Sequence, residues 1–429
     1  MGAKRAADTI VALSSGRPPA AVAIVRTSGA TAFAAAERIA GPLPAVRRAV
    51  VRTLNDPASG TPIDRALVLR FTASASATGE DIVEYQCHGG RATVDALIAV
   101  LCREPGMRLA KPGEFTRRAL ANGRIDLTEA EGLADLLAAE TESQRRTAMT
   151  RAGGALRHCL DGWRERLLEL AARAEVAIDY ADEADGAGDS ALAGDIGELH
   201  RDIAKLLAAP RVEPLRDGVR VVIAGPTNTG KSSLVNALAQ AERAIVTAVA
   251  GTTHDVIEVP LSIGGVPFLL VDTAGLRQSD DEVEAIGIER AERESRGADI
   301  LLWLGSADTS PVENAVVLRS RADLGPHDHD TADLAISSLT GQGLDRLKQI
   351  LVARAAAMLP QGDALAIDRR QHALLAEAGA ALARTAAIDD PVLVAEELRV
   401  ARHAIDQISG RAGVEDVLDA LFARFCLGK

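Results

Sequence analysis

Apolar residues recur at helical spacing in two long stretches of the chain, and a different pattern separates them. In residues 156–174, apolar side chains return every three or four positions, which gathers them on one face of a helix. Residues 394–408 repeat this spacing, and residues 414–425 carry another apolar face of the same kind. We expect the stripes on the two sides to bury one another, so that one helical domain contains the intervening segment as an insertion.

The intervening segment alternates between short apolar runs and helical stretches. The runs have the length and composition of buried strands, and loops rich in glycine and polar residues follow them. This alternation predicts a mostly parallel sheet with helices on both faces. The expected strands are residues 219–224, 268–271, 300–304, 315–318 and 334–336, and residues 343–358 form the last helix.

The N-terminal part of the chain predicts a separate mixed domain. Residues 9–13, 21–25, 66–71 and 81–87 are expected to form strands, and residues 30–39 have helical spacing. The predicted fold class is therefore α/β with an additional α domain. It consists of an N-terminal α+β domain (residues 1–117), a helical domain (118–215 and 361–429) and the inserted domain (216–360).

Composition narrows the class of protein. The 429 residues carry a net charge of −12 and 47% hydrophobic residues, which is ordinary for a globular chain and argues against a surface that wraps nucleic acid by itself. The four cysteines form no C-x-x-C pair, so we expect reduced thiols. No apolar run is long enough to span a bilayer and no signal peptide is visible, so we predict a cytoplasmic protein without a membrane partner.

Residues 225–232 carry the pattern G-x-x-x-x-G-K-[ST] between a predicted strand and a predicted helix. In a phosphate-binding loop, the glycines allow backbone N–H groups to converge on an anion at the N-terminus of a helix. Lys231 would reach the outer phosphates, and Ser232 would hold Mg²⁺. A glycine-rich turn without this function would have the same spacing, so the motif needs support from the rest of the domain.

Three further motifs supply that support. Asp272 ends an apolar strand and precedes Gly275, where a carboxylate and an N–H group would meet Mg²⁺ and a γ-phosphate. Residues 251–255 offer hydroxyl groups on a loop, and residues 337–344 are similar to the loop that supports the base in GTPases. Four elements in this order predict a Ras-like GTPase domain.

Motifs outside the GTPase domain make the resemblance more specific. They are residues 8–12, 24–29, 78–81, 86–90, 112–116, 122–127 and 425–429. Together with the nucleotide motifs, they resemble the MnmE family, also called TrmE, whose members are GTPases of tRNA wobble-uridine modification. The resemblance includes both ends and the middle of the chain.

The resemblance implies a second binding site in the N-terminal domain. Arg26, Glu80, Arg124 and Lys429 match the positions at which the family binds 5-formyltetrahydrofolate or a related one-carbon folate. Cations suit the glutamate tail of a folate, and a carboxylate suits its pterin. Without the resemblance, Arg26 and Arg124 would be interpreted as solvated charges.

The resemblance also implies partners. The N-terminal domain is expected to form a homodimer. A flavin-dependent partner, MnmG, is expected to form a heterotetramer with the chain and to act with it on the wobble uridine of certain tRNAs. The product would carry an aminomethyl or carboxymethylaminomethyl group at C5.

The family's hydrolytic residues map onto this chain by motif. Leu276 follows Gly275 where other GTPases place a glutamine, and a leucine cannot orient the attacking water. The resemblance assigns this role to Glu284, which matches the family's glutamate. The resemblance assigns K⁺ to Asn228, Thr247, Thr252 and the carbonyl of Val249, and Mg²⁺ to Ser232 and Thr253. The full set of GTP-binding residues is Asn228, Thr229, Gly230, Lys231, Ser232, Ser233, Thr247, Ala248, Val249, Ala250, Gly251, Thr252, Thr253, Asp272, Thr273, Ala274, Gly275 and Asp323.

The guanine-binding motif departs from the family pattern Asn-Lys-x-Asp. Asp323 keeps the carboxylate that accepts from guanine, whereas Ser320 and Arg321 replace the Asn and the Lys. We therefore expect guanine preference to be retained and nucleotide affinity to be lower.

Two other functional classes remain open from the sequence. A regulatory or assembly GTPase would hydrolyse GTP without modification chemistry, and an interaction scaffold would hydrolyse nothing. The folate motif and the C-terminal lysine favour the modification enzyme. The role of Cys426 also stays open between a buried thiol and a nucleophile.

Overall fold

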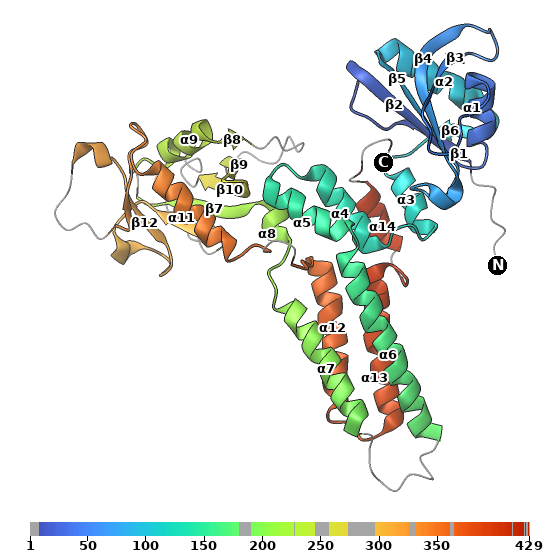
Figure 1. The fold of residues 1–429 in the computed structure, drawn as a ribbon. Coiled ribbons are helices and arrows are strands. Elements are labelled where there is room, and N and C mark those ends of the chain that lie inside the picture. Colours follow the sequence, from blue (N-terminus) through green and yellow to red (C-terminus); the bar gives the residue numbers. More distant parts are fainter. Residues whose placement is uncertain are drawn as a thin grey trace, which may run out of the picture. The chain divides into compact units, whose positions relative to one another are not determined.

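The computed structural model describes residues 8–179, 190–226, 228–244, 257–272, 297–325, 332–360, 364–413, 415–423, 425 and 428 (Figure 1). The chain divides into two compact units. The first consists of Met1–Ala134 with Ser409–Lys429, and the second is Asp135–Ile408. Within the described residues, none of the helices has both the length and the apolar character that crossing a bilayer requires.

The first unit contains a sheet in the order β3-β4-β5-β2-β1-β6. Helices α1 (Ala32–Ala40) and α2 (Arg91–Arg103) share a core with alternate residues of the strands, among them Val25 and Tyr85, so one face of the sheet is buried. The strands are β1 (Thr9–Leu13), β2 (Ala20–Ser28), β3 (Val50–Asn55), β4 (Pro62–Phe71), β5 (Ile82–Gly89) and β6 (Met107–Leu109). The predicted strands of this part are confirmed, and β3 and β6 were missed.

The C-terminal helix packs within the first unit. Helices α3 (Glu114–Ala121), α4 (Leu127–Ala138) and α14 (Glu415–Phe422) share a small core. Gly113 has φ +70°, and a Cβ on it would lie 2.8 Å from the carbonyl oxygen of Phe422. A side chain at this position would therefore separate α3 from α14.

The second unit contains the helical bundle. Helices α6 (Ala155–Asp179), α7 (Ser190–Leu207), α12 (Arg369–Thr385) and α13 (Pro391–Ser409) run side by side in Figure 1. One core joins the stripe of α6, which includes Leu160 and Leu167, to the stripe of α13, which includes Leu398 and Ile405. The predicted mutual burial of the stripes in residues 156–174 and 394–408 is confirmed. The apolar face of α14 packs instead with α3 and α4 in the first unit.

The inserted sheet has the order β13-β12-β11-β7-β10-β9-β8 among the described residues. Neighbours from β13 to β10 pair in parallel, and β9 and β8 add antiparallel pairs at one edge, as a mostly parallel sheet requires. Helices α9 (Lys231–Ala241) and α11 (Leu344–Ala356) pack in the larger of its two cores. The strands are β7 (Val219–Ala224), β8 (Arg243–Ala244), β9 (Ile257–Ile263), β10 (Val266–Asp272), β11 (Ile300–Trp303), β12 (Val316–Arg319) and β13 (Leu334–Ala335).

Two short helices connect the bundle to the inserted sheet. Helix α5 (Glu142–Ala152) donates from Ser143 N to the Gly265 carbonyl at 3.2 Å, in the turn between β9 and β10. Gln144 completes a capping box with Thr141, the N-cap of α5, and donates through Nε2 to the Leu215 carbonyl at 3.1 Å, in α8 (Glu213–Asp217). Helix α5 is therefore held at two separate points, the turn between β9 and β10 and helix α8.

Candidate functional site

The phosphate-loop motif lies at the end of β7, the central strand of the inserted sheet as described. Strand β7 pairs in parallel with β10 on one side and with β11 on the other. Gly225, the first loop residue, has φ +146°, and a Cβ on it would lie 2.5 Å from the carbonyl oxygen of Leu304. Gly230 has φ +91° and is the N-cap of α9. Both glycines are therefore required by the backbone.

Lys231 is folded back onto its own loop. Its Nζ donates to the carbonyl oxygens of Gly225 at 2.9 Å and of Pro226 at 2.6 Å, and the residue is only 6% exposed. These carbonyls hold the ammonium group at the mouth of the loop. Phosphate oxygens would offer stronger, charged acceptors at the same place. The arrangement fits the predicted role of Lys231.

Two of the residues expected near Mg²⁺, Asp272 and Ser232, are described, and both lie at this edge of the sheet. Asp272 is the last residue of β10, is 2% exposed, and pairs in register with Ile223 of β7. Ser232 is exposed in the first turn of α9. A carboxylate and a hydroxyl are ligand types that Mg²⁺ prefers, so the described residues fit this ion. Thr253, the other predicted ligand, lies outside the described residues.

Arg321 connects the guanine loop to the phosphate loop. Its Nη2 donates to the Asn228 carbonyl at 3.2 Å, and both residues have positive φ, +57° and +61°. Ser320 lies next to Gly230, and Asp323 is exposed in the short helix that follows. Sequence reasoning counted Arg321 as a lost contact, whereas in the structure it supplies a contact between the two loops.

A second cluster lies in the first unit, where β2 meets α3. Arg26 forms an ion pair with Glu84 at 2.8 Å and lies over the Phe115 ring at 5.8 Å. Glu80 accepts from Ser28 Oγ at 2.8 Å. Two strand positions separate Arg26 from Ser28, so both side chains lie on one face of β2. The side chain of Arg26 therefore lies next to that of Ser28, which holds Glu80.

Arg124 and the C-terminus approach this cluster from two other directions. The Cγ of Arg124 lies close to Gly79, and its guanidinium donates to the Ala73 carbonyl. Gly428 accepts from Ser14 Oγ at 2.9 Å, at the end of β1. Strand β1 pairs with β2, and Ala12 lies opposite Arg26. The residue before Lys429 is thus held beside the strand that carries Arg26, and Lys429 itself lies outside the described residues.

Sequence reasoning missed Arg118. This residue of α3 donates through Nη1 to Glu80 Oε2 at 2.9 Å and through Nη2 to Glu114 Oε1 at 3.2 Å. The i,i+4 spacing of Glu114 and Arg118 was visible as a helical ion pair. Its connection to Glu80 depends on the packing of α3 against the sheet.

Comparison with known proteins decides the family. The family model described as "MnmE helical domain" matches residues 127–426, and the model described as "GTP-binding protein TrmE N-terminus" matches residues 9–124. The chain belongs to the MnmE family. Its relatives named "tRNA modification GTPase MnmE" include one from Rhizorhabdus wittichii, 53% identical over 99% of this chain and 97% of the relative. Another, from Erythrobacter litoralis, is 50% identical over 98% of this chain and the whole relative.

Two solved structures match parts of the chain. The Aquifex aeolicus protein Era covers 38% of this chain and 66% of its own, with 22% identity and a TM-score of 0.24. The G domain of the T. maritima iron transporter FeoB covers 32% of this chain and 98% of its own, with 24% identity and a TM-score of 0.23.

Several predicted MnmE-family site residues cannot be placed. They lie outside the described residues, and their roles stay predictions. They are Thr247, Ala248, Val249, Ala250, Gly251, Thr252, Thr253, Thr273, Ala274, Gly275, Glu284 and Lys429.

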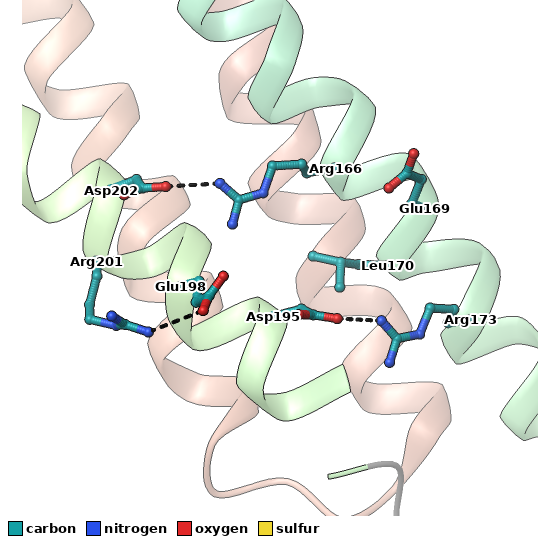
Figure 2. Close-up of a pocket in the computed structure, with 8 residues that line it drawn as sticks. All are labelled: Arg166, Glu169, Leu170, Arg173, Asp195, Glu198, Arg201 and Asp202. Atoms are coloured by element: carbon teal, nitrogen blue, oxygen red, sulfur yellow. Dashed lines mark hydrogen bonds and ion pairs between the residues drawn. The ribbon is translucent and has the colours of Figure 1, made fainter. Parts of the chain in front are cut away.

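A third feature is a cavity of about 400 Å³ between α6 and α7. Figure 2 shows charged side chains of both signs around it. Arg166 pairs with Asp202 at 2.8 Å, and Arg173 pairs with Asp195 at 2.5 Å. These pairs join the two helices to each other. Because carboxylates neutralise the arginines around the cavity, it has no excess of positive charge with which to attract a nucleotide.

Proposed function

We propose that this chain, a GTPase of tRNA modification, is stimulated by K⁺ and acts with the flavin-dependent protein MnmG. The pair would add an aminomethyl or carboxymethylaminomethyl group at C5 of the wobble uridine of certain tRNAs. The full-length identity to relatives named tRNA modification GTPase carries the proposal. The net charge of −12 is compatible with a protein that leaves much of the tRNA contact to its partner.

The nucleotide half of the proposal uses the loop at the end of β7. Lys231 would exchange its two carbonyl acceptors for phosphate oxygens when GTP binds. Ser232 and Thr253 would hold Mg²⁺, which neutralises charge that develops on the phosphates. Asp323 would accept from the guanine edge, and Glu284 would orient the attacking water. The remaining predicted loop residues would surround the nucleotide.

The proposed K⁺ site rests on Asn228. This residue has φ +61°, an uncommon conformation for a side chain other than glycine, and its carbonyl is held by Arg321. An amide oxygen is a suitable ligand for a hard monovalent cation. Thr247, Thr252 and the carbonyl of Val249 would complete the set. A cation at this place supplies positive charge near the phosphates, the role that an arginine finger has in other GTPases.

The one-carbon half of the proposal uses the cluster around Arg26 and Glu80. A 5-formyltetrahydrofolate or related folate would place its pterin at Glu80. Its anionic tail would meet cations from among Arg26, Arg124 and Lys429. The proximity of Gly428 to β1 supports the assignment of the C-terminus to this site.

The first unit also offers a surface for the proposed homodimer. Helices α1 and α2 bury one face of its sheet, and the opposite face carries the exposed side chains of Val22, Val51 and Leu67. Val51 lies directly opposite Leu67 on the neighbouring strand. Adjacent exposed apolar side chains on a sheet are typical of an interface, and a second copy of this face would cover them.

The experiment that tests the GTPase half is steady-state hydrolysis of GTP and ATP, each in K⁺ and in Na⁺, over a range of protein concentrations. We expect rapid turnover of GTP in K⁺ alone, with a specific activity that rises as the protein associates. Hydrolysis of ATP at the GTP rate would refute guanine selection by Asp323. Equal turnover in Na⁺ would refute the K⁺ site, and unchanged turnover in Glu284→Ala would refute the assignment of Glu284.

A further inference from the structure

Four charged side chains of alternating sign form a continuous row in the first unit. Arg108 donates to Glu114 through both terminal nitrogens, at 2.9 and 2.5 Å. Arg118 then bridges Glu114 and Glu80 at 3.2 and 2.9 Å. The row begins at Arg108 in β6, which also pairs with Asp8 at 3.2 Å, and it ends at Glu80, in the proposed folate site.

The two members of this row nearest the proposed folate site are shielded from water. The side chains of Arg118 and Glu80 are 12% and 18% exposed. Charge-assisted hydrogen bonds are stronger than neutral ones, and salt screens a partly buried pair much less than an exposed one. Burial acts to raise the pKa of Glu114, but hydrogen bonds from Arg108, the Lys111 N–H and Arg118 outweigh it and lower the pKa from 4.5 to about 2. Glu114 is therefore a constantly charged anchor for Arg118.

The two oxygens of Glu80 have different surroundings. Oε2 accepts from Arg118 Nη1 at 2.9 Å and from Ser28 Oγ at 2.8 Å. Among the hydrogen bonds of the described residues, none goes to Oε1. Because Arg118 and Ser28 both hold the same oxygen, the carboxylate cannot rotate without breaking both bonds, and Oε1 keeps one direction.

We propose that Arg118 is the positioning residue of this site: it fixes the Glu80 carboxylate so that Oε1 accepts the N–H groups of a bound heterocycle carrying an amino group next to a ring N–H. This inference rests on the proposed function, in which the heterocycle is the pterin of a one-carbon folate. Glu80 contacts the ligand, and Arg118 acts through Glu80.

The neighbouring residue supplies a matched control. Arg117 is on the same helix and has the same chemistry, but its side chain is 54% exposed and its partner Asp419 is also exposed. We expect Arg117→Met to leave folate binding unchanged. Arg118→Met should weaken it, and Arg118→Lys should have an intermediate effect because a lysine cannot bridge two carboxylates with a planar fork.

The test is calorimetric titration of the full chain with 5-formyltetrahydrofolate and with an analogue that lacks the 2-amino group of the pterin. The ratio of the two affinities reports recognition of the 2-amino group at Glu80. A general loosening of the fold would lower the affinity for both ligands by the same factor. We expect Arg118→Met to lower affinity for the folate about 10- to 100-fold and to bring the ratio close to one, and we expect Glu80→Gln to do the same. The Arg118→Lys variant, checked for an unchanged melting temperature, keeps the test valid if the methionine variant does not fold.

The outcomes separate the two ideas. Failure of the unaltered chain to bind 5-formyltetrahydrofolate overturns the proposed one-carbon site, and the inference about its ligand with it. A second outcome overturns the positioning role alone. In it, Glu80→Gln abolishes folate binding, but the ratio of the two affinities is unchanged in Arg118→Met and in Arg118→Lys. An equal loss for both ligands in Arg118→Met and in Arg118→Lys also overturns it, because that result shows a purely structural residue.

Discussion

Replacing Arg151 by methionine should destabilise the helical bundle where it joins the inserted sheet. Arg151 lies in α5 with only 3% of its side chain exposed, and its guanidinium pairs with Asp135 and, at 3.4 Å, with Asp368. Asp368 is the N-cap of α12, and Asp135 also pairs with Arg216 of α8 at 2.9 Å. One side chain thus connects three helices and, through Arg216, a fourth.

The expected magnitude follows from which charges lose their partner. Removing one member of a buried ion pair typically costs about 3–5 kcal/mol, because the remaining charge stays buried. Asp135 keeps Arg216, and Asp368 keeps its bond from the Gln371 N–H at 2.9 Å. Both carboxylates therefore retain some compensation, and we expect the lower end of that range, about 3 kcal/mol.

The two tryptophans of the chain allow this loss to be located. Trp163 is buried in the bundle core, and Trp303 is in β11 of the inserted sheet. In a Trp303→Phe background, urea unfolding followed by fluorescence reports the bundle alone. With a denaturant slope of about 3 kcal/mol per molar, Arg151→Met should lower the midpoint by about 1 M. In a Trp163→Phe background, the fluorescence of Trp303 reports the unfolding of the inserted sheet in the same way.

Two further variants decide whether the buried charge is the cause. Arg145→Met removes an arginine from the same helix, but its pair with Glu142 is exposed, so we expect a change below about 0.5 kcal/mol. Adding Asp368→Asn to Arg151→Met removes one uncompensated charge and keeps a good N-cap residue, so part of the stability should return. The reasoning is wrong if Arg151→Met unfolds at the same midpoint as Arg145→Met.

Three more predictions concern the two sites and the thiols. Arg321→Ala should weaken binding of a fluorescent GDP about tenfold, because it removes the bond to the Asn228 carbonyl; affinity equal to that of the unaltered chain would show that the contact is dispensable. Because the folded-state pKa of Glu114 is depressed to about 2, its stabilisation is present above the unfolded pKa near 4.5 and is lost as pH falls from there to about 2. Glu114→Gln should therefore flatten acid unfolding of the first unit in that window, and an unchanged acid limb would contradict the assignment. Burial, with a smaller effect of Asp202, raises the pKa of Cys159 to about 11, so alkylation by iodoacetamide at pH 7.5, followed by mass spectrometry, should be slow at this thiol until the chain unfolds; rapid labelling of the folded chain would contradict this.

The elements that sequence analysis missed are defined by their partners and not by their own pattern. Strand β6 has three residues and exists because it pairs in parallel with β1 at the edge of the sheet. Strand β3 is the other edge, and among its six residues only Leu54 is buried. An edge strand with one buried residue has almost no hydrophobic alternation to detect. The helical stripes were found because each carries a long, regular apolar face.

The candidate sites likewise contain residues that could be found from a local pattern and residues that could not. The phosphate loop was predictable because its residues are consecutive and its glycines are required by local backbone geometry. Arg321 reaches Asn228 across 93 positions, and Arg118 reaches Glu80 across 38. Long, flexible side chains in loops and helix turns give no periodic signal. Their partners become known only when the sheet and the helices around them are in place.

The attachment of the inserted domain explains why an interruption of about 150 residues leaves the bundle intact. The Val212 N–H donates to the Ile367 carbonyl at 3.2 Å, so the chain enters and leaves the insertion at adjacent points. A domain whose ends are close together can be inserted without separating the elements on either side. Helix α7 ends at Leu207 and α12 begins at Arg369, and the two helices share the bundle core. The insertion therefore leaves α7 and α12 together in one bundle core, although about 160 positions separate the two helices in the sequence.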